Sequence, residues 1–121
     1  MKPNPKLSIL PGFLFVFDID YPHEGAVEEL ICLADVNDSS DMIRVFDAVL
    51  KPEFVGYSES DRCWIIDTIS YYLERGETFV EVLEKRSFLF SDEIVDGRGF
   101  MRVLLECLSL YQAEIGKVKD L

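Results

Sequence analysis

Histidine and cysteine, two side chains that often bind metals, are scarce in this sequence. His23 is the only histidine, so a metal site built from several histidines is excluded. The cysteines are Cys32, Cys63 and Cys107, an odd number with wide spacing and no CxxC pair, which is a poor disulfide framework. Each lies in an apolar stretch, so we expect buried free thiols, no metal site and a reducing, cytoplasmic location.

Long apolar runs and basic residues are also in short supply. No apolar stretch approaches the roughly 20 residues of a membrane-spanning helix, so no membrane association is expected. The run from Leu7 to Phe17 is interrupted by Pro11-Gly12 and followed by Asp18, which argues against a signal peptide. Only 12 Lys and Arg residues oppose 23 Asp and Glu residues, so direct binding of nucleic acid, which needs a basic face, is not expected.

Motifs that mark a cofactor or catalytic site are missing as well. No glycine pattern for binding phosphate is present, and no nucleophile is paired in sequence with His23, so no cofactor and no catalytic residue are assigned. The segment that starts at Asp35 begins like a calcium loop. However, Ser40 stands where that loop needs glycine, and Phe46 stands where it needs glutamate. Helix capping is the better interpretation of these residues.

Asp18-x-Asp20, at the end of an apolar segment, resembles the DxD motif of haloacid-dehalogenase-type phosphatases. In that family the first aspartate attacks phosphorus, the second handles protons, and the pair helps to hold magnesium. Here Tyr21-Pro22 replaces the Thr or Val that usually follows, and no Asp-Asp pair is found downstream. A small Asp-dependent phosphohydrolase is therefore the second alternative function, because a motif outside its structural context is a weak signal.

Apolar material is what the chain has in quantity. Hydrophobic residues make up 49% of the 121 residues, including nine Phe, five Tyr and one Trp, which argues against intrinsic disorder. This length and composition predict one compact domain over residues 1–121. Residues 1–11, which open with Pro3 and Pro5 between lysines, are expected to form a loose N-terminal tail.

The spacing of apolar residues predicts an α+β fold that is predominantly α-helical with a minor strand component. Phe13–Asp20 is rich in aromatic and branched residues and predicts a strand, and Phe88–Phe90 is a second strand candidate. Helical spacing recurs in four stretches, residues 26–34, 42–50, 64–73 and 100–115, and a short helix is expected at 79–83. A further strand over residues 30–36, paired with Phe13–Asp20, is the alternative at the end of the first stretch. Pro52 is expected to end the second helix, while Ser58 and Gly76 are suited to cap the third. An all-α bundle is the alternative fold.

The acidic residues are the most informative feature of the composition, because they give a net charge of −11. Between Asp18 and Asp67 there are thirteen acids and three bases, a net charge of −10, so this segment carries nearly all of the excess. A concentrated negative field repels nucleic acids and anionic membranes, attracts basic proteins and speeds their encounter. The other interpretation is that acidity only maintains solubility.

Carboxylates and tyrosines in this acidic segment form the predicted binding site. They lie in expected turns or on polar helix faces, where carboxylates would pair with a partner's lysines and arginines and tyrosines would act as anchors. The predicted partner-binding residues are Tyr21, Glu24, Glu28, Glu29, Asp35, Asp38, Asp41, Glu53, Tyr57, Glu59 and Asp61.

A compact, acidic domain of this length without a catalytic motif is similar to the bacterial immunity proteins that neutralise contact-dependent growth-inhibition toxins. The similarity concerns the length, acidity and intracellular chemistry of the whole chain, and no residue is carried over. It implies a protein that is not an enzyme and that blocks a basic partner, a cognate toxin domain of the nuclease type. The first alternative is another acidic interaction module, such as a nucleic-acid mimic or an adaptor subunit. Nothing in the sequence bears on the oligomeric state.

Overall fold

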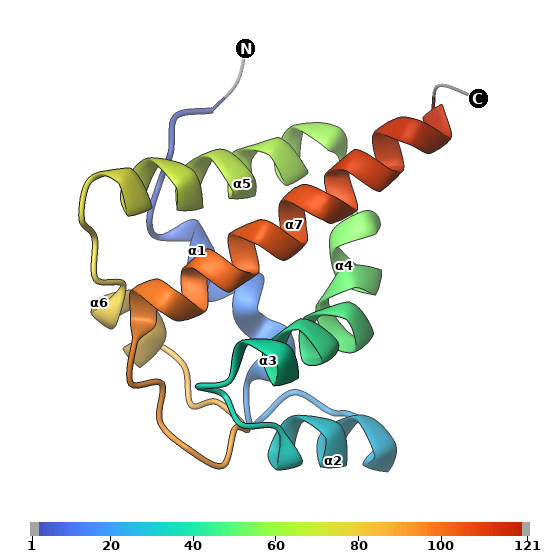
Figure 1. Cartoon of the computed structure of the whole chain (residues 1–121), viewed down its shortest axis with the longest axis vertical. Coiled ribbons are helices and arrows are strands. Elements are labelled where there is room, and N and C mark those ends of the chain that lie inside the picture. Colours follow the sequence, from blue (N-terminus) through green and yellow to red (C-terminus); the bar gives the residue numbers. More distant parts are fainter. Residues whose placement is uncertain (1–2, 120–121) are drawn as a thin grey trace.

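The computed structural model describes residues 3–119, with side chains described for residues 3–116, and consists of helices joined by irregular segments (Figure 1). The elements in chain order are α1 (Ile9–Phe13), the 3₁₀ helix η1 (Leu14–Phe17), α2 (Gly25–Leu33), α3 (Ser39–Val45), the π-helical segment η2 (Phe46–Leu50), α4 (Lys51–Val55), α5 (Glu59–Glu74), α6 (Val80–Glu84) and α7 (Gly97–Lys119). Within residues 3–119 there is no β-strand, so the all-α alternative describes the fold better than α+β does.

The long helix α7 organises the rest of the molecule. It runs across the face of the molecule in Figure 1 and packs against α3, α4, α5 and η2. Its buried side chains include Met101, Leu104, Leu108 and Tyr111, which recur at intervals of three and four residues and therefore share one face. Burying a large apolar side chain stabilises a fold by roughly 1.5–3 kcal/mol, so this face is a major part of the core.

An aromatic cluster joins the N-terminal segment to α7. The ring of Phe17 lies 5.9 Å from Phe46 and 5.4 Å from Phe90, and Phe46 lies 5.6 Å from Phe100, measured between ring centroids. Edge-to-face and tilted pairs at such distances add attraction beyond the area that they bury. The cluster thereby connects η1, η2, the segment before α7 and α7 itself.

The strand predicted at Phe13–Asp20 is wrong. Phe13 ends α1, and the next four residues form η1. Phe13, Leu14, Val16 and Phe17 are all buried, so this apolar run is surrounded by the core. A short, continuous apolar run looks the same in sequence whether it is a buried strand or a buried helix.

The strand component at Phe88–Phe90 is not formed either, although this segment does lie beside the end of η1. One isolated bridge joins Asp18 and Phe88. The amide of Ile19 donates to the carbonyl of Ser87 at 2.8 Å, and the amide of Leu89 donates to the carbonyl of Phe17 at 2.9 Å. The helical turn of η1 ends just before Asp18, and a turn closed by the amide of Tyr21 donating to the carbonyl of Asp18 at 3.0 Å follows it, so pairing does not extend into a strand.

The loose tail predicted over residues 1–11 needs correction for the part that the structure describes, residues 3–11. Leu10 is fully buried, and the backbone carbonyl of Asn4 accepts a hydrogen bond from Nε1 of Trp64 at 2.8 Å. The amide of Lys6 donates to Oγ1 of Thr68 at 3.4 Å. These contacts hold the segment along α5. Residues 1 and 2 lie outside the described part of the chain.

Pro52 does not end the helix that precedes it, contrary to expectation. The helical path continues from α3 through η2 into α4, and Pro52 lies in the first turn of α4. Proline inside an α-helix removes one amide donor and clashes with the carbonyl four residues earlier. The wider π-helical turn of η2 changes the spacing just before Pro52, which allows the ring to be accommodated.

Both caps predicted for the third helix are present in α5. Oγ of Ser58 accepts a hydrogen bond from the amide of Asp61 at 3.1 Å, which satisfies a donor at the helix start. Gly76 follows the helix with a φ of 79°, a left-handed conformation that glycine adopts without steric cost. Arg98 of α7 donates to the carbonyls of Leu73 and Glu77, so a cation also covers this helix end.

Candidate functional site

The predicted binding residues fall into two groups at opposite ends of the molecule. The first surrounds α2 and its connection to α3, and the second surrounds α4 and the start of α5, which lies at the other end of the long axis (Figure 1). The first group, called the α2 group, contains Tyr21, Glu24, Glu28, Glu29, Asp35, Asp38 and Asp41. The second, called the α5 group, contains Glu53, Tyr57, Glu59 and Asp61. The eleven predicted binding residues therefore do not form one continuous surface.

The aspartates of the α2 group hold their own loop together. Asp38 is the N-cap of α3, and its carboxylate accepts a hydrogen bond from the amide of Asp41 at 3.0 Å. The carboxylate of Asp41 accepts from the amide of Asp35 at 2.8 Å and pairs with Arg44. These bonds, the Asp35 amide first, lower the pKa of Asp41 below its usual value. The capping interpretation of this segment is thereby confirmed.

Tyr21 packs within the molecule rather than standing out as an anchor. It is half-buried, and its ring lies 5.1 Å from Phe15 and 4.8 Å from His23 between ring centroids. His23 in turn has Nε2 2.5 Å from the carbonyl oxygen of Val16. The pair therefore attaches the segment before α2 to η1.

A hollow of about 240 Å³ lies where the α5 group meets α1. We call it the α1–α5 groove. Its walls are mostly apolar or aromatic, with a single carboxylate at Asp61. The lining residues are Ile9, Gly12, Phe13, Tyr57, Asp61, Trp64 and Ile65. Two of the predicted binding residues, Tyr57 and Asp61, thus line a hollow that is open to solvent.

The aromatic side chains of the groove are held in place from behind. Tyr57 is half-buried with its ring centroid 6.1 Å from that of Phe13. Burial raises the pKa of Tyr57, and the nearby carboxylates of Glu53 and Asp61 raise it further. Trp64 is fixed by the hydrogen bond from Nε1 to Asn4. The groove is therefore a preformed aromatic surface in a negative field.

Arg62 lies next in sequence to this groove but is turned into the fold. Its side chain is buried, and Nε donates to Oε1 of Gln112 in α7 at 2.8 Å. Its Nη1 donates to the backbone carbonyl of Tyr57. Arg62 therefore positions Tyr57 without neutralising the groove at the surface.

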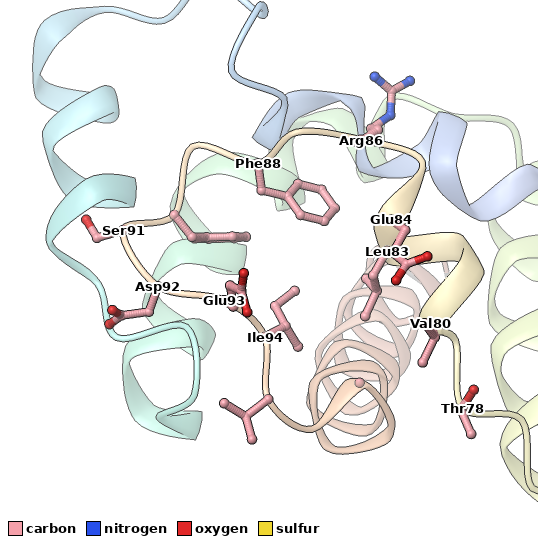
Figure 2. A pocket seen from close by; sticks show the side chains of 13 residues that line it. Thr78, Val80, Leu83, Glu84, Arg86, Phe88, Ser91, Asp92, Glu93 and Ile94 are labelled. Carbon is pink, nitrogen blue, oxygen red and sulfur yellow. The ribbon is translucent and has the colours of Figure 1, made fainter.

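A second hollow, of about 480 Å³, lies beneath the irregular segment between α6 and α7. Figure 2 shows Leu83, Phe88 and Ile94 pointing into it, with Glu84 and Glu93 on its walls. None of the predicted binding residues line it. Sequence reasoning missed this hollow because Phe88–Phe90 was assigned to a strand. The feature of the sequence that could have indicated the hollow is an apolar run among the acidic residues of a long connection between helices.

Two side chains fix the segment over this second hollow. The side chain of Asn37 donates to the carbonyl of Glu93 at 3.0 Å and accepts from the amide of Val95 at 2.9 Å. Arg86 points away from the hollow (Figure 2), pairing with Asp18 at 3.1 Å and donating to the carbonyl of Pro11. The segment is thus attached to both α1 and the α2–α3 connection.

Asp18, the first aspartate of the DxD pattern, has both carboxylate oxygens engaged. Oδ1 accepts from the amide of Asp20 at 2.9 Å, and Oδ2 pairs with Nη1 of Arg86 at 3.1 Å. The Asp20 amide, followed by Arg86, lowers the pKa of Asp18. Asp18 therefore has a structural role, because its carboxylate joins the end of η1 to the segment after α6.

Cys32 and Cys63 are half-buried and Cys107 is buried, and all three are free thiols, as predicted, although only one is fully buried. Within the described part of the chain, no three His, Cys, Asp or Glu side chains are grouped so that they could hold a metal ion. None of the helices over residues 3–119 combines the length and apolar character needed to span a membrane.

No protein-family model, curated protein or solved structure matches this chain.

Proposed function

We propose that this chain is an acidic binding protein that neutralises a basic protein partner. In its most specific form, the partner is a toxin domain of the nuclease type, and the chain acts as an immunity protein of the contact-dependent growth-inhibition kind. The partner's positive cleft, which normally receives phosphates, would be covered by carboxylates of this protein. Such a mechanism needs no chemistry from the chain itself.

The observation that carries the proposal is the α1–α5 groove with its bordering carboxylates. Among the described residues, neither Glu53 nor Asp61 forms an ion pair, whereas Asp18, Asp41 and Glu114 each do. Unpaired carboxylates beside exposed aromatic surface are what a basic partner needs for both fast encounter and a desolvated anchor. The α2 group adds negative potential at the opposite end of the molecule, but Asp38 and Asp41 of that group are hydrogen-bonded within their own loop.

Asp18 favours binding over the phosphohydrolase alternative. A nucleophilic carboxylate must present one oxygen to the phosphorus atom. Here Arg86 and the Asp20 amide occupy both oxygens, and Arg86 is tied as well to the carbonyl of Pro11. With only 16% of its side chain exposed, Asp18 also leaves little room for a phosphorus atom to approach.

Affinity capture from the native host, followed by association kinetics with the captured protein, tests the proposal. The captured protein should be basic, and its association rate should fall steeply with salt, because screening shortens the reach of exposed charges to about 8 Å at physiological ionic strength. If the captured protein is a nuclease, saturating amounts of this chain should abolish its activity. An acidic partner, or an association rate that salt does not change, would contradict the proposal.

Two double variants with the same change of charge locate the binding surface. Glu53→Lys with Asp61→Lys alters the α5 group, and Glu28→Lys with Glu29→Lys alters the α2 group. We expect the first pair to slow association by about tenfold or more, and the second pair to have a smaller effect, because nearby charges steer an encounter most strongly. Equal effects would mean that only the overall charge matters, and the groove would lose its assigned role.

A further inference from the structure

The size of the α1–α5 groove suits one side chain rather than a whole small molecule. Pockets for drug-sized ligands occupy roughly 300–1,000 Å³. At about 240 Å³ the groove falls below that range, whereas the second hollow falls within it. A groove of this size in a protein interface receives a single anchor residue of the partner.

The lining specifies a side chain with an apolar stem and a cationic end. Ile9, Phe13 and Ile65 offer apolar surface for a stem. Tyr57 and Trp64 offer the π systems that attract a cation, and Asp61 offers a carboxylate to pair with it. The carboxylate of Glu53 strengthens the negative potential at Tyr57.

No cation of the described chain neutralises this end of the groove. Asp61 forms no ion pair among the described residues. The neighbouring Arg62 is committed to Gln112 and to the carbonyl of Tyr57. The carboxylate of Asp61 is therefore left available to a cation of a partner, while the charge of Arg62 is held behind the groove.

We propose that the α1–α5 groove binds the side chain of an arginine from the partner protein. Arginine is favoured over lysine because its planar guanidinium stacks on aromatic side chains and pairs with a carboxylate through two parallel hydrogen bonds. This inference rests on the proposed function and names the chemistry of its central contact. The groove holds the arginine, and the surrounding carboxylates guide the partner toward it.

Trp64 makes the proposal directly measurable, because it is the only tryptophan and gives a single indole N–H signal in a ¹H–¹⁵N spectrum of the full chain. The probes are the N-acetyl amides of arginine, lysine and norleucine, which differ at the end of similar stems. We expect the arginine probe to shift this signal in a saturable way at millimolar concentrations. It should bind about tenfold more tightly than norleucine and more tightly than lysine.

Each remaining outcome overturns the proposal in a defined way. Equal binding of arginine and norleucine would make the groove a merely apolar contact. Tighter binding of lysine would mean that the proposal names the wrong cation, and the absence of any saturable shift would mean that the groove is not a binding site.

Two variants test the roles of individual residues. Asp61→Asn and Tyr57→Leu should each weaken the arginine probe several-fold. The control Asp92→Asn makes the same substitution at an exposed position between α6 and α7, outside both groups of predicted binding residues, and should leave the affinity of the probe unchanged.

The failure of this inference is distinguishable from the failure of the proposed function. If the groove does not bind arginine but the captured partner is basic and associates in a salt-dependent way, the proposed function is supported and the partner's anchor residue binds at another place. If the groove binds arginine but the captured partner is acidic, the arginine site is supported and the proposed function is wrong.

Discussion

At the scale of single residues, Arg62 supports the geometry of the groove from the inside of the fold. It is buried, and it joins the segment before α5 to α7 through its bonds to Tyr57 and Gln112. A buried guanidinium stabilises a fold only while its hydrogen bonds are made, and its loss leaves their acceptors without partners.

We therefore expect Arg62→Ala to lower the free energy of unfolding by about 2–3 kcal/mol, the cost of buried polar groups left unsatisfied. Arg44→Ala is the matched control, because Arg44 is exposed and its one ion pair among the described residues is with Asp41, one turn away, so its loss should cost less than about 0.5 kcal/mol. Urea denaturation of the two variants measures both values. A loss at Arg62 as small as that at Arg44 would contradict the structural role.

Asp18 should make the stability of the fold depend on pH. Its pKa in the folded protein is lowered below 3.8 by the Asp20 amide and Arg86, so its contribution is fully present above pH 3.8 and is lost as the pH falls through the folded value. Asp18→Asn should therefore lower Tm at neutral pH, and the difference from the natural chain should shrink in acid. Thermal unfolding of both proteins between acid and neutral pH measures this difference in Tm. A difference that does not change with pH would refute the role assigned to the Asp18 carboxylate.

At the scale of elements, the start of α7 is fitted closely against the segment before α6. A Cβ atom on Gly97 would lie 2.7 Å from the carbonyl oxygen of Thr78 and 3.2 Å from Cδ1 of Leu83. Backbone on one side and a core side chain on the other leave little room for adjustment. Glycine at this position therefore allows α7 to begin against the wall of the second hollow.

Two glycine substitutions in the same helix should consequently have opposite effects. Gly97→Ala should destabilise the fold by about 1–3 kcal/mol, because the new methyl group forces the backbone apart. Gly116→Ala meets open space inside α7 and should stabilise it by about 0.5–1 kcal/mol through helix propensity. Denaturant unfolding compares the two, and a stabilising effect at Gly97 would show that the contact with Thr78 is looser than described.

At the scale of the whole molecule, the net charge of −11 works against the compact state. Like charges repel one another in the folded protein, and added salt screens that repulsion. We expect Tm to rise as NaCl is increased from low concentration to physiological levels and above. A fall in Tm would mean that the internal ion pairs of Asp18, Asp41 and Glu114 outweigh the repulsion.

The helices and their caps could be predicted from the sequence because they depend on neighbours along the chain. The period of apolar residues predicted α5 and most of α7, and Ser58 and Gly76 marked the ends of α5, whereas the second half of α2 also fitted a strand. The apolar run Phe13–Phe17, within the predicted strand Phe13–Asp20, has no polar face, so its pattern carried no information to separate a strand from a helix.

The amino-acid order alone determined that the chain is acidic, rich in aromatic residues and mainly helical, since these follow from composition and local spacing. Only the tertiary structure decided which carboxylates remain for a partner. It placed Asp18 against Arg86, and it brought α1 beside α5 so that Tyr57, Asp61 and Trp64 share one groove. The physical reason is that a carboxylate bonds to whichever donor the fold places next to it, and residues far apart in sequence become neighbours only when the core has packed.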